Sequence, residues 1–243
     1  MEGIVYVAHG SQKMGKNQKM QAFYQELIQT HPETEQGLAY LEKHPDTIAV
    51  IVAKMYQKGI REFIIVPLLL FSAMHMEEDI PQALKEVELC YSDVTFSVSQ
   101  PFAQEPEVVT ILEERCREKL KDFPTNPAIL LVAHGSTNYE KPGKIVEKIA
   151  KELAINLELP VTAGVLYGKP DYLLEAKQLI QQHPQILVIP FFLFDGHLLD
   201  KIQLALTEIK PNTVIFSYTE TLNLDRRLIN GINHLMNEAR VDG

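Results

Sequence analysis

The sequence predicts an α/β protein made of two similar, doubly wound domains with parallel sheets. Two observations support this prediction. Short apolar runs alternate with amphipathic stretches along the chain, and one set of sequence blocks occurs twice. Alternating strands and helices are typical of parallel sheets covered by helices on both faces. We therefore expect a mostly four-stranded parallel sheet in each domain.

The repeated blocks occur in the same order in both halves. They are Gly3–Ser11 with Ala128–Ser136, Pro45-Asp46 with Pro170-Asp171, Ile64–Phe71 with Leu187–Phe194, and His75 with His197. Self-similarity of this kind indicates a duplicated domain of about 120 residues. Two prolines interrupt the helical pattern at 123–127, which places the predicted domains at 1–123 and 124–243.

Each predicted strand is a short run of aliphatic residues, and each predicted helix has apolar residues at helical spacing. In the first half, the strands are Ile4–Ala8, Gly37–Leu41, Phe63–Leu70 and Val94–Val98, and the helices are Gln18–Gln29, Thr47–Lys58, Glu77–Leu89 and Pro106–Lys121. In the second half, the strands are Ile129–Ala133, Val161–Leu166, Ile186–Leu193 and Val214–Ser217, and the helices are Lys144–Asn156, Tyr172–Gln182, Leu198–Ile209 and Leu224–Glu238. The run 64–70 is apolar on both faces, as expected for a central parallel strand.

Composition excludes several classes of function. The 243 residues include 23 Lys and Arg against 32 Asp and Glu, for a net charge of −9, which argues against a nucleic-acid partner. Two cysteines without a C-x-x-C motif exclude a disulfide framework and an iron–sulfur site. No apolar run is long enough to span a bilayer, and the first residues lack a signal-peptide pattern. We expect a cytoplasmic protein without a membrane partner.

Three chemically active side chains follow predicted strands of the first half. His9 follows the first strand, Glu42 the second, and His75 the third. Ligands of doubly wound sheets bind at the carboxyl ends of the strands, and neighbouring strands lie about 4.8 Å apart. Two imidazoles and a carboxylate suit a divalent metal such as Fe, Co, Ni or Zn. A lone loop histidine is usually structural, but His9 and His75 both recur, as His134 and His197.

Gly10 and Ser11 are predicted to open the helix after the first strand. Backbone N–H groups at such a position can hold an anion, and Lys13 follows closely. The alternative is that Ser11 caps the helix and the lysine is solvated. Neither a G-x-G-x-x-G fingerprint nor a P-loop occurs, so the sequence supports neither a dinucleotide nor ATP.

The blocks V-A-H-G-S, A-Y-L-E at 39–42 and V-P-L-L-L-F-S-A-M-H-M-E-E-D-I-P at 66–81 resemble the class II tetrapyrrole chelatases. The long, two-domain sirohydrochlorin chelatases are the most similar, over nearly the whole chain. The resemblance implies chelatase-like domains with the macrocycle in a cleft between them, related by a pseudo-twofold. It also implies insertion of a divalent metal into sirohydrochlorin, without ATP or a permanently bound cofactor. His9, Glu42 and His75 then bind the metal and act in catalysis.

The resemblance also suggests how the two halves differ. Tyr167 stands where the second half would need its glutamate, and the residues after His197 lack the D-I-P form, so His134 and His197 belong to a degenerate site. Gly10, Ser11, Lys13, Ala73 and Met74 are the candidates for binding the tetrapyrrole. Relatives usually have small, glycine-type residues where Ala73 and Met74 stand here.

The metal is expected to be Fe2+, for sirohaem synthesis. Cobalt insertion for cobalamin synthesis is the alternative, and Ni2+ is a further candidate. A non-catalytic metal carrier or sensor would use the same ligands. A phosphotransfer enzyme with His9 as nucleophile is disfavoured, because no arginine adjoins His9 or His134. The duplication makes a monomer plausible, because one chain carries both halves.

Overall fold

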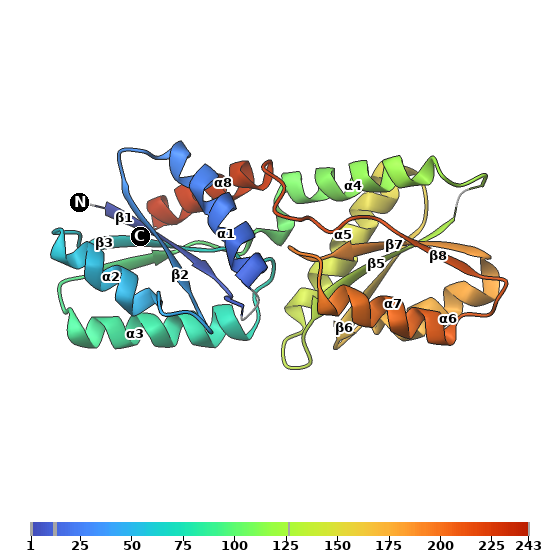
Figure 1. Ribbon diagram of the computed structural model, residues 1–243, viewed down its shortest axis with the longest axis horizontal. Helices are drawn as coiled ribbons and strands as arrows, with labels where there is room; N and C mark the ends of the chain where they lie inside the picture. Colours follow the sequence, from blue (N-terminus) through green and yellow to red (C-terminus); the bar gives the residue numbers. More distant parts are fainter. Residues whose placement is uncertain (1, 12–13, 126, 243) are drawn as a thin grey trace. The chain divides into compact units, whose positions relative to one another are not determined.

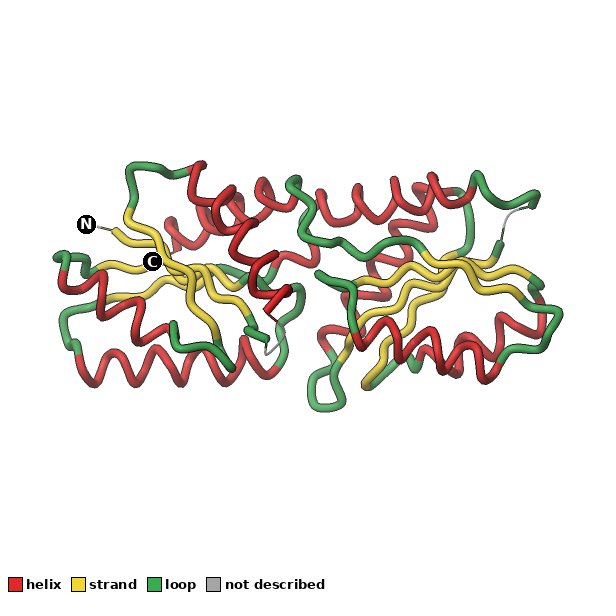
Figure 2. The backbone as a smooth tube through the Cα atoms, in the orientation of Figure 1, coloured by secondary structure: helices red, strands yellow, loops and turns green. Residues whose placement is uncertain are grey.

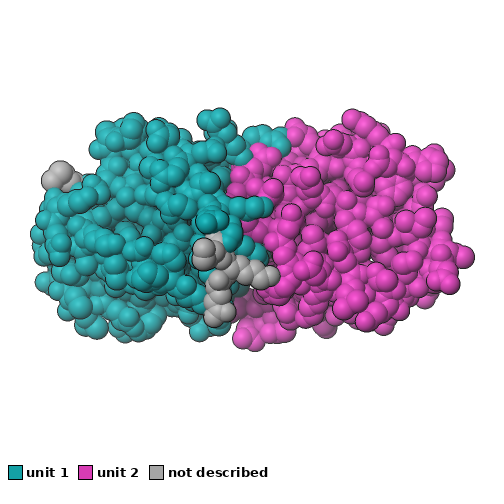
Figure 3. Space-filling model, in the orientation of Figure 1, with its two compact units in different colours: residues 1–103, 226–243 teal, residues 104–225 magenta. Residues whose placement is uncertain are grey.

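The computed structural model describes residues 2–11, 14–125 and 127–242, which form two compact units (Figures 1 and 3). Unit 1 comprises residues 1–103 and 226–243, and unit 2 comprises residues 104–225. Each unit contains a four-stranded parallel sheet. The predicted fold class, two similar α/β domains with parallel sheets, is confirmed.

The elements alternate along the chain as predicted. Those of unit 1 are β1 (Glu2–Ala8), α1 (Met14–Leu27), the 3-10 turn η1 (Ile28–Thr30), β2 (Glu35–Tyr40), α2 (Ile48–Gln57), β3 (Glu62–Pro67), the π-helical turn η2 (His75–Asp79), α3 (Ile80–Cys90), β4 (Thr95–Val98) and, from the end of the chain, α8 (Leu228–Asp242). The 3-10 turn η3 (Phe102–Gln104) spans the boundary between the units. Those of unit 2 are α4 (Pro106–Leu120), β5 (Ala128–Gly135), α5 (Lys141–Leu157), β6 (Val161–Tyr167), α6 (Tyr172–Gln182), β7 (Gln185–Phe191), α7 (His197–Ile209) and β8 (Ile215–Tyr218).

The two sheets share one topology. Their strand orders are β2-β1-β3-β4 and β6-β5-β7-β8, and all pairs are parallel. Figure 2 shows the two sheets in yellow, each with helices beside it. In unit 1, β2 is added on one side of β1, and β3 and β4 are added on the other side, so the strand order reverses at β1. In unit 2, it reverses in the same way at β5. Such a reversal opens a crevice at the carboxyl ends of the strands, where ligands of this fold class bind.

Both faces of the unit 1 sheet are covered by helices. Figure 1 shows α2 and α3 on one face and α1 and α8 on the other. The core under α2 and α3 includes Val5, Ile65 and Val52, all fully buried. On the opposite face, the ring of Tyr6 in β1 packs edge-on against Tyr24 of α1, with centroids 5.8 Å apart. Burial of apolar side chains on both faces fixes the strands whose ends carry the predicted site residues.

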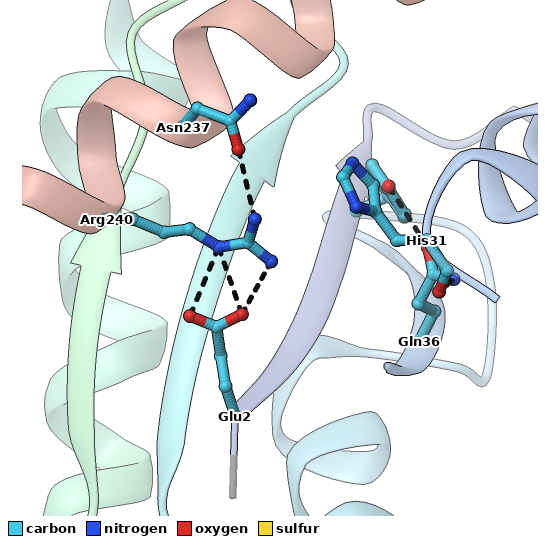
Figure 4. A network of polar contacts seen from close by, with 6 residues as sticks. Glu2, His31, Gln36, Asn237 and Arg240 are labelled. Carbon is cyan, nitrogen blue, oxygen red and sulfur yellow. Dashed lines mark hydrogen bonds and ion pairs between the residues drawn. The ribbon is translucent and has the colours of Figure 1, made fainter. Parts of the chain in front are cut away.

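The last helix of the chain belongs to unit 1, whereas α4 belongs to unit 2. Arg240 of α8 binds Glu2 of β1 through two guanidinium nitrogens, at 2.6–3.2 Å (Figure 4). Asn233 of α8 also contacts the hydroxyl of Thr30, at 3.3 Å. The compact units therefore differ from the predicted halves 1–123 and 124–243, because α4 belongs to unit 2 and α8 to unit 1. The boundary between the two copies of the repeat, near residue 123, stays a prediction.

Most predicted element bounds agree with the structure within a few residues, and the differences have local causes. The strand predicted at Phe63–Leu70 ends at Pro67, although the Leu68 N–H still donates to the Val7 carbonyl of β1 at 2.8 Å. The helix predicted from Leu224 begins at Leu228, because Asn223 and Leu224 adopt positive φ angles. Among the described residues, no helix combines the length and apolarity needed to cross a membrane.

Candidate metal centre

Three strand ends of unit 1 bring His9, Glu42 and His75 together. His9 follows β1 directly, and Glu42 lies two residues beyond β2. The pairing of these strands continues past their ends, because Leu41 N–H donates to Ala8 and Glu42 N–H donates to His9, both at 3.0 Å. Backbone hydrogen bonds therefore hold Glu42 beside His9.

Gly10 allows this close approach. Its φ angle is +91°, and a Cβ atom placed on it would lie 1.9 Å from the carbonyl oxygen of Glu42. Any other residue would clash there and would also be strained at this φ angle. The glycine after His9 is thus a steric requirement for the crossing of the loops that follow β1 and β2.

His75 opens the π-helical turn η2, after a loop fixed by its own hydrogen bonds. The buried hydroxyl of Ser72 donates to the Glu77 carboxylate, and the Ala73 carbonyl accepts from the N–H groups of Met76 and Glu77. Ile80 N–H then donates to the His75 carbonyl, which closes the wider turn. Single π turns inside helices are frequently found at functional sites.

Asp79 orients the His75 imidazole. Its Oδ2 lies 2.5 Å from Nδ1 of His75. Because a carboxylate accepts hydrogen bonds, Nδ1 carries the proton and Nε2 keeps a lone pair for a metal ion. A carboxylate on the far ring nitrogen is the usual partner of a metal-binding histidine.

The three side chains form a compact ligand set. One donor atom from each of His9, Glu42 and His75 lies within 4.8 Å of the other two. Nδ1 of His9 is 2.9 Å from Oε1 of Glu42, and the two imidazole centroids are 4.4 Å apart at an interplanar angle of 62°. About half of the His9 side chain and a quarter of the His75 side chain are exposed. The set is therefore open to a metal ion from solvent.

The charges at the site favour a cation. Partial burial lowers the pKa of the His9 imidazole, and His75 adds to this effect, whereas hydrogen bonding to its own backbone and the charge of Glu42 oppose it. A hydrogen bond from Lys43 lowers the pKa of the Glu42 carboxyl group, with Nζ 3.0 Å from Oε2. At neutral pH the site thus presents neutral His9 and ionised Glu42, the forms that bind metals.

The candidate tetrapyrrole-binding residues lie on the same loops. Gly10 and Ser11 follow His9, and the Ser11 carbonyl accepts from the Asn17 side chain at 2.8 Å. Ser11 precedes the first residue of α1 by three positions. Ala73 and Met74 precede His75, and 48% of Met74 is exposed. Lys13 lies outside the described residues. The roles of these residues stay predictions.

The predicted second site has a different chemistry. His134 lies near the end of β5, and His197 is the first residue of α7. Within the described ranges, only the set in unit 1 brings three His, Cys, Asp or Glu side chains close enough together to hold one metal ion. The His134 ring instead lies 5.0 Å from the ring of Tyr167.

Reasoning from the sequence missed two residues that shape the site. Asp79 holds His75 and is detectable as a carboxylate four residues after a histidine, which places both on one side of a helical turn. Lys43 forms an ion pair with its neighbour Glu42. Its backbone has a positive φ angle of 58°, a conformation that the sequence does not indicate.

Several known proteins are similar to this chain in sequence or in fold. A sirohydrochlorin ferrochelatase from Priestia megaterium is 28% identical over 242 residues, which cover 96% of this chain and 89% of the relative. A sirohydrochlorin cobaltochelatase from the same organism is 21% identical over 225 residues, or 86% of this chain and 70% of the relative. SirB from Bacillus subtilis, solved with Fe3+, matches with a TM-score of 0.85 at 24% identity, covering 98% of this chain and 95% of SirB.

The family assignment covers both halves of the chain. The CbiX family model matches residues 3–119 and again residues 128–239, so each half matches it once. The two matches together contain all three ligands in the first half and both recurring histidines in the second. The chain is therefore a member of the CbiX family.

Proposed function

We propose that this chain inserts a divalent metal ion, preferentially Fe2+, into sirohydrochlorin to give sirohaem. The observation that carries the proposal is the solvent-accessible set of His9, Glu42 and His75, of which His9 is exposed and the other two are partly buried, in a member of the CbiX family. The metal is a substrate here, and no permanently bound cofactor is required.

The ligand set suits temporary metal binding. Two imidazoles and one carboxylate provide three donors on one side of the ion, which leaves positions open on the other side. The exposed face of the site is where the ring nitrogens of a macrocycle can replace the protein ligands. Glu42 supplies the negative charge that attracts the cation, and its second oxygen contacts Lys43.

The same groups can take up the protons that the reaction releases. Insertion of M2+ into a free-base tetrapyrrole forms metal–nitrogen bonds and releases two pyrrole N–H protons. His9 and His75 regain free lone pairs when the metal leaves them, and imidazole accepts protons near neutral pH. Asp79 stabilises the resulting charge on His75 through its contact with Nδ1.

Cobalt insertion is the second candidate. Imidazole and carboxylate ligands bind Co2+ as well as Fe2+. The curated relatives include enzymes named for each metal. Over most of the chain, the relatives named as ferrochelatases are 28% and 25% identical, against 21% for a cobaltochelatase, and the preference for iron rests on this difference. A second cobaltochelatase is 30% identical but matches only 49% of the chain.

An anaerobic assay tests the function. The full chain is mixed with sirohydrochlorin and either Fe2+ or Co2+, and metallation is followed by visible absorbance. We expect the protein to accelerate metallation, with Fe2+ giving the higher kcat/KM. A rate equal to the uncatalysed one with both metals would exclude a chelatase. Tight metal binding without sirohydrochlorin binding would instead indicate a metal carrier or sensor.

We also infer that the enzyme acts as a monomer in the cytoplasm. One chain already contains two copies of the CbiX unit, whereas a cobaltochelatase from Sulfolobus acidocaldarius matches only 49% of this chain over 94% of its own length. Sedimentation equilibrium is expected to give the mass of one chain, 27.6 kDa. Twice that mass would overturn the inference about oligomeric state.

A further inference from the structure

The second unit repeats the backbone of the metal site with different side chains. A Cβ atom on Gly135 would lie 2.2 Å from the carbonyl oxygen of Tyr167, just as one on Gly10 would lie 1.9 Å from that of Glu42. Both glycines have positive φ angles. The loops after β5 and β6 thus cross in the same way as those after β1 and β2, and Tyr167 occupies the backbone position of Glu42.

The side chains at two equivalent positions differ in charge between the units. Glu42 is replaced by Tyr167, and Asp79, four residues after His75, is replaced by Lys201, four residues after His197. Two carboxylates of the first site are therefore lost, and one ammonium group is gained. A site built this way repels a metal cation and attracts an anion.

Lys201 and Tyr167 contact each other at the strand ends. Nζ of Lys201 lies 3.2 Å from the hydroxyl oxygen of Tyr167 and 5.0 Å from the centroid of its ring. The His134 ring lies on the same tyrosine, with centroids 5.0 Å apart. We call His134, Tyr167 and Lys201 the second strand-end cluster.

The hydrogen bonds of this cluster leave donors available. Lysine has three N–H donors and no acceptor, so Lys201 donates to the Tyr167 oxygen. The tyrosine O–H is then oriented away from Lys201 and can donate to another group. A carboxylate accepts from both a hydroxyl and an ammonium group, and hydrogen bonds to charged partners are the stronger ones.

We propose that the second strand-end cluster binds a carboxylate, with Lys201 Nζ and Tyr167 Oη as its donors. The proposal rests on the proposed function for the source of that carboxylate, because sirohydrochlorin carries carboxylate side chains. The other possible source is a free polycarboxylate. Nothing in the cluster requires a metal ion.

The experiment uses the full chain and the variants Lys201→Gln and Tyr167→Phe. Lys201→Gln removes the positive charge, and Tyr167→Phe removes the hydroxyl donor; both leave the size of the side chain similar. Lys177→Gln, which changes an exposed lysine on α6, is the matched control. Far-UV circular dichroism confirms that all variants fold. The binding of metal-free sirohydrochlorin is measured by fluorescence quenching, and the binding of Co2+ alone by calorimetry.

We expect Lys201→Gln to raise the Kd for sirohydrochlorin about tenfold, and Tyr167→Phe to raise it by a smaller factor. The Kd for Co2+ should not change in either variant, because its ligands lie in unit 1. The control should bind both ligands like the unchanged chain. Equal sirohydrochlorin affinity in Lys201→Gln and in the control would overturn the proposal.

A second probe separates this proposal from the proposed function. Mellitate, an aromatic ring with carboxylates on every carbon, is titrated into the metal-free protein by calorimetry. Loss of mellitate binding in Lys201→Gln would support the carboxylate site. A failure of the unchanged chain to bind sirohydrochlorin would exclude the chelatase function but not this site. Mellitate binding that is equal with and without Lys201 would overturn the site itself.

Discussion

The two units of this chain place different chemistry on one backbone design. In unit 1, the strand ends carry two histidines and two carboxylates, and His9 lies 2.9 Å from Glu42. In unit 2, the corresponding positions carry two histidines, a tyrosine and a lysine, and Lys201 lies 3.2 Å from Tyr167. At the positions of Glu42 and Asp79, unit 2 thus has a neutral hydroxyl and an ammonium group in place of two carboxylates, and this difference is the basis of the proposed anion site.

Removal of the metal-binding histidines should have the largest effect. We expect His9→Ala and His75→Ala each to lower the rate of metal insertion by at least about 100-fold, because each loses a metal ligand and a proton acceptor. His197→Ala, the counterpart in unit 2, should keep kcat within about twofold. The measurement is the anaerobic metallation rate at saturating sirohydrochlorin. A loss in His197→Ala as large as that in His75→Ala would contradict the assignment of one metal site.

Asp79 provides a finer test of the comparison, because Lys201 replaces it in unit 2. Asp79→Asn keeps the shape of the side chain but weakens its hold on the His75 ring. We expect the Kd for Co2+ to rise about 10- to 100-fold, the usual range for partners of metal ligands. Calorimetry with Co2+ measures it, and Glu78→Gln on the same turn is the control. An unchanged Kd would show that Asp79 does not position His75.

The paired glycines separate folding from function. Gly10→Ala and Gly135→Ala introduce the same clash in the two units, at 1.9 and 2.2 Å from a carbonyl oxygen. Each should lower the free energy of unfolding by about 1–3 kcal/mol, measured by denaturant titration. Only Gly10→Ala should also weaken Co2+ binding, because it displaces Glu42. Equal loss of Co2+ affinity in both variants would mean that the effect is not local to unit 1.

The pH dependence should be the smallest effect near neutrality. Partial burial lowers the pKa of His9, so with rising pH this imidazole becomes neutral before the ordinary pKa of about 6.5 is reached. Metal binding needs the neutral ring. Protonation of His9 is therefore expected to weaken Co2+ binding only as the pH drops below about 6.5. NMR titration of the His9 ring in the metal-free chain measures this, and a midpoint clearly above about 6.5 would contradict the lowered pKa of His9.

The sequence predicts the fold well because its signals are local. The apolar runs predict the eight strands found among the described residues. The bounds of α6 agree at both ends, since Asp171 caps its first turn. The duplication, together with the strand-end positions of His9, Glu42 and His75, also predicts which residues converge. The spacing between each strand and the histidine that follows it is short, and the repeat displays it in both halves.

The remaining features depend on contacts that no local pattern encodes. The exchange of α4 and α8 between the sequence halves depends on long-range contacts, such as that of Arg240 with Glu2. The π turn at His75 comes after a loop held by hydrogen bonds of Ser72 and Ala73, which the sequence pattern does not display. The contact of Lys201 with Tyr167 joins residues 34 positions apart.

We expect metal to bind in unit 1 and not in unit 2. The most direct test is the stoichiometry of Co2+ binding, measured by calorimetry on the full chain and on the double variant His9→Ala/His75→Ala. We expect one equivalent of Co2+ for the unchanged chain and none for the double variant. Two equivalents in the unchanged chain, or one remaining in a folded double variant, would contradict the claim.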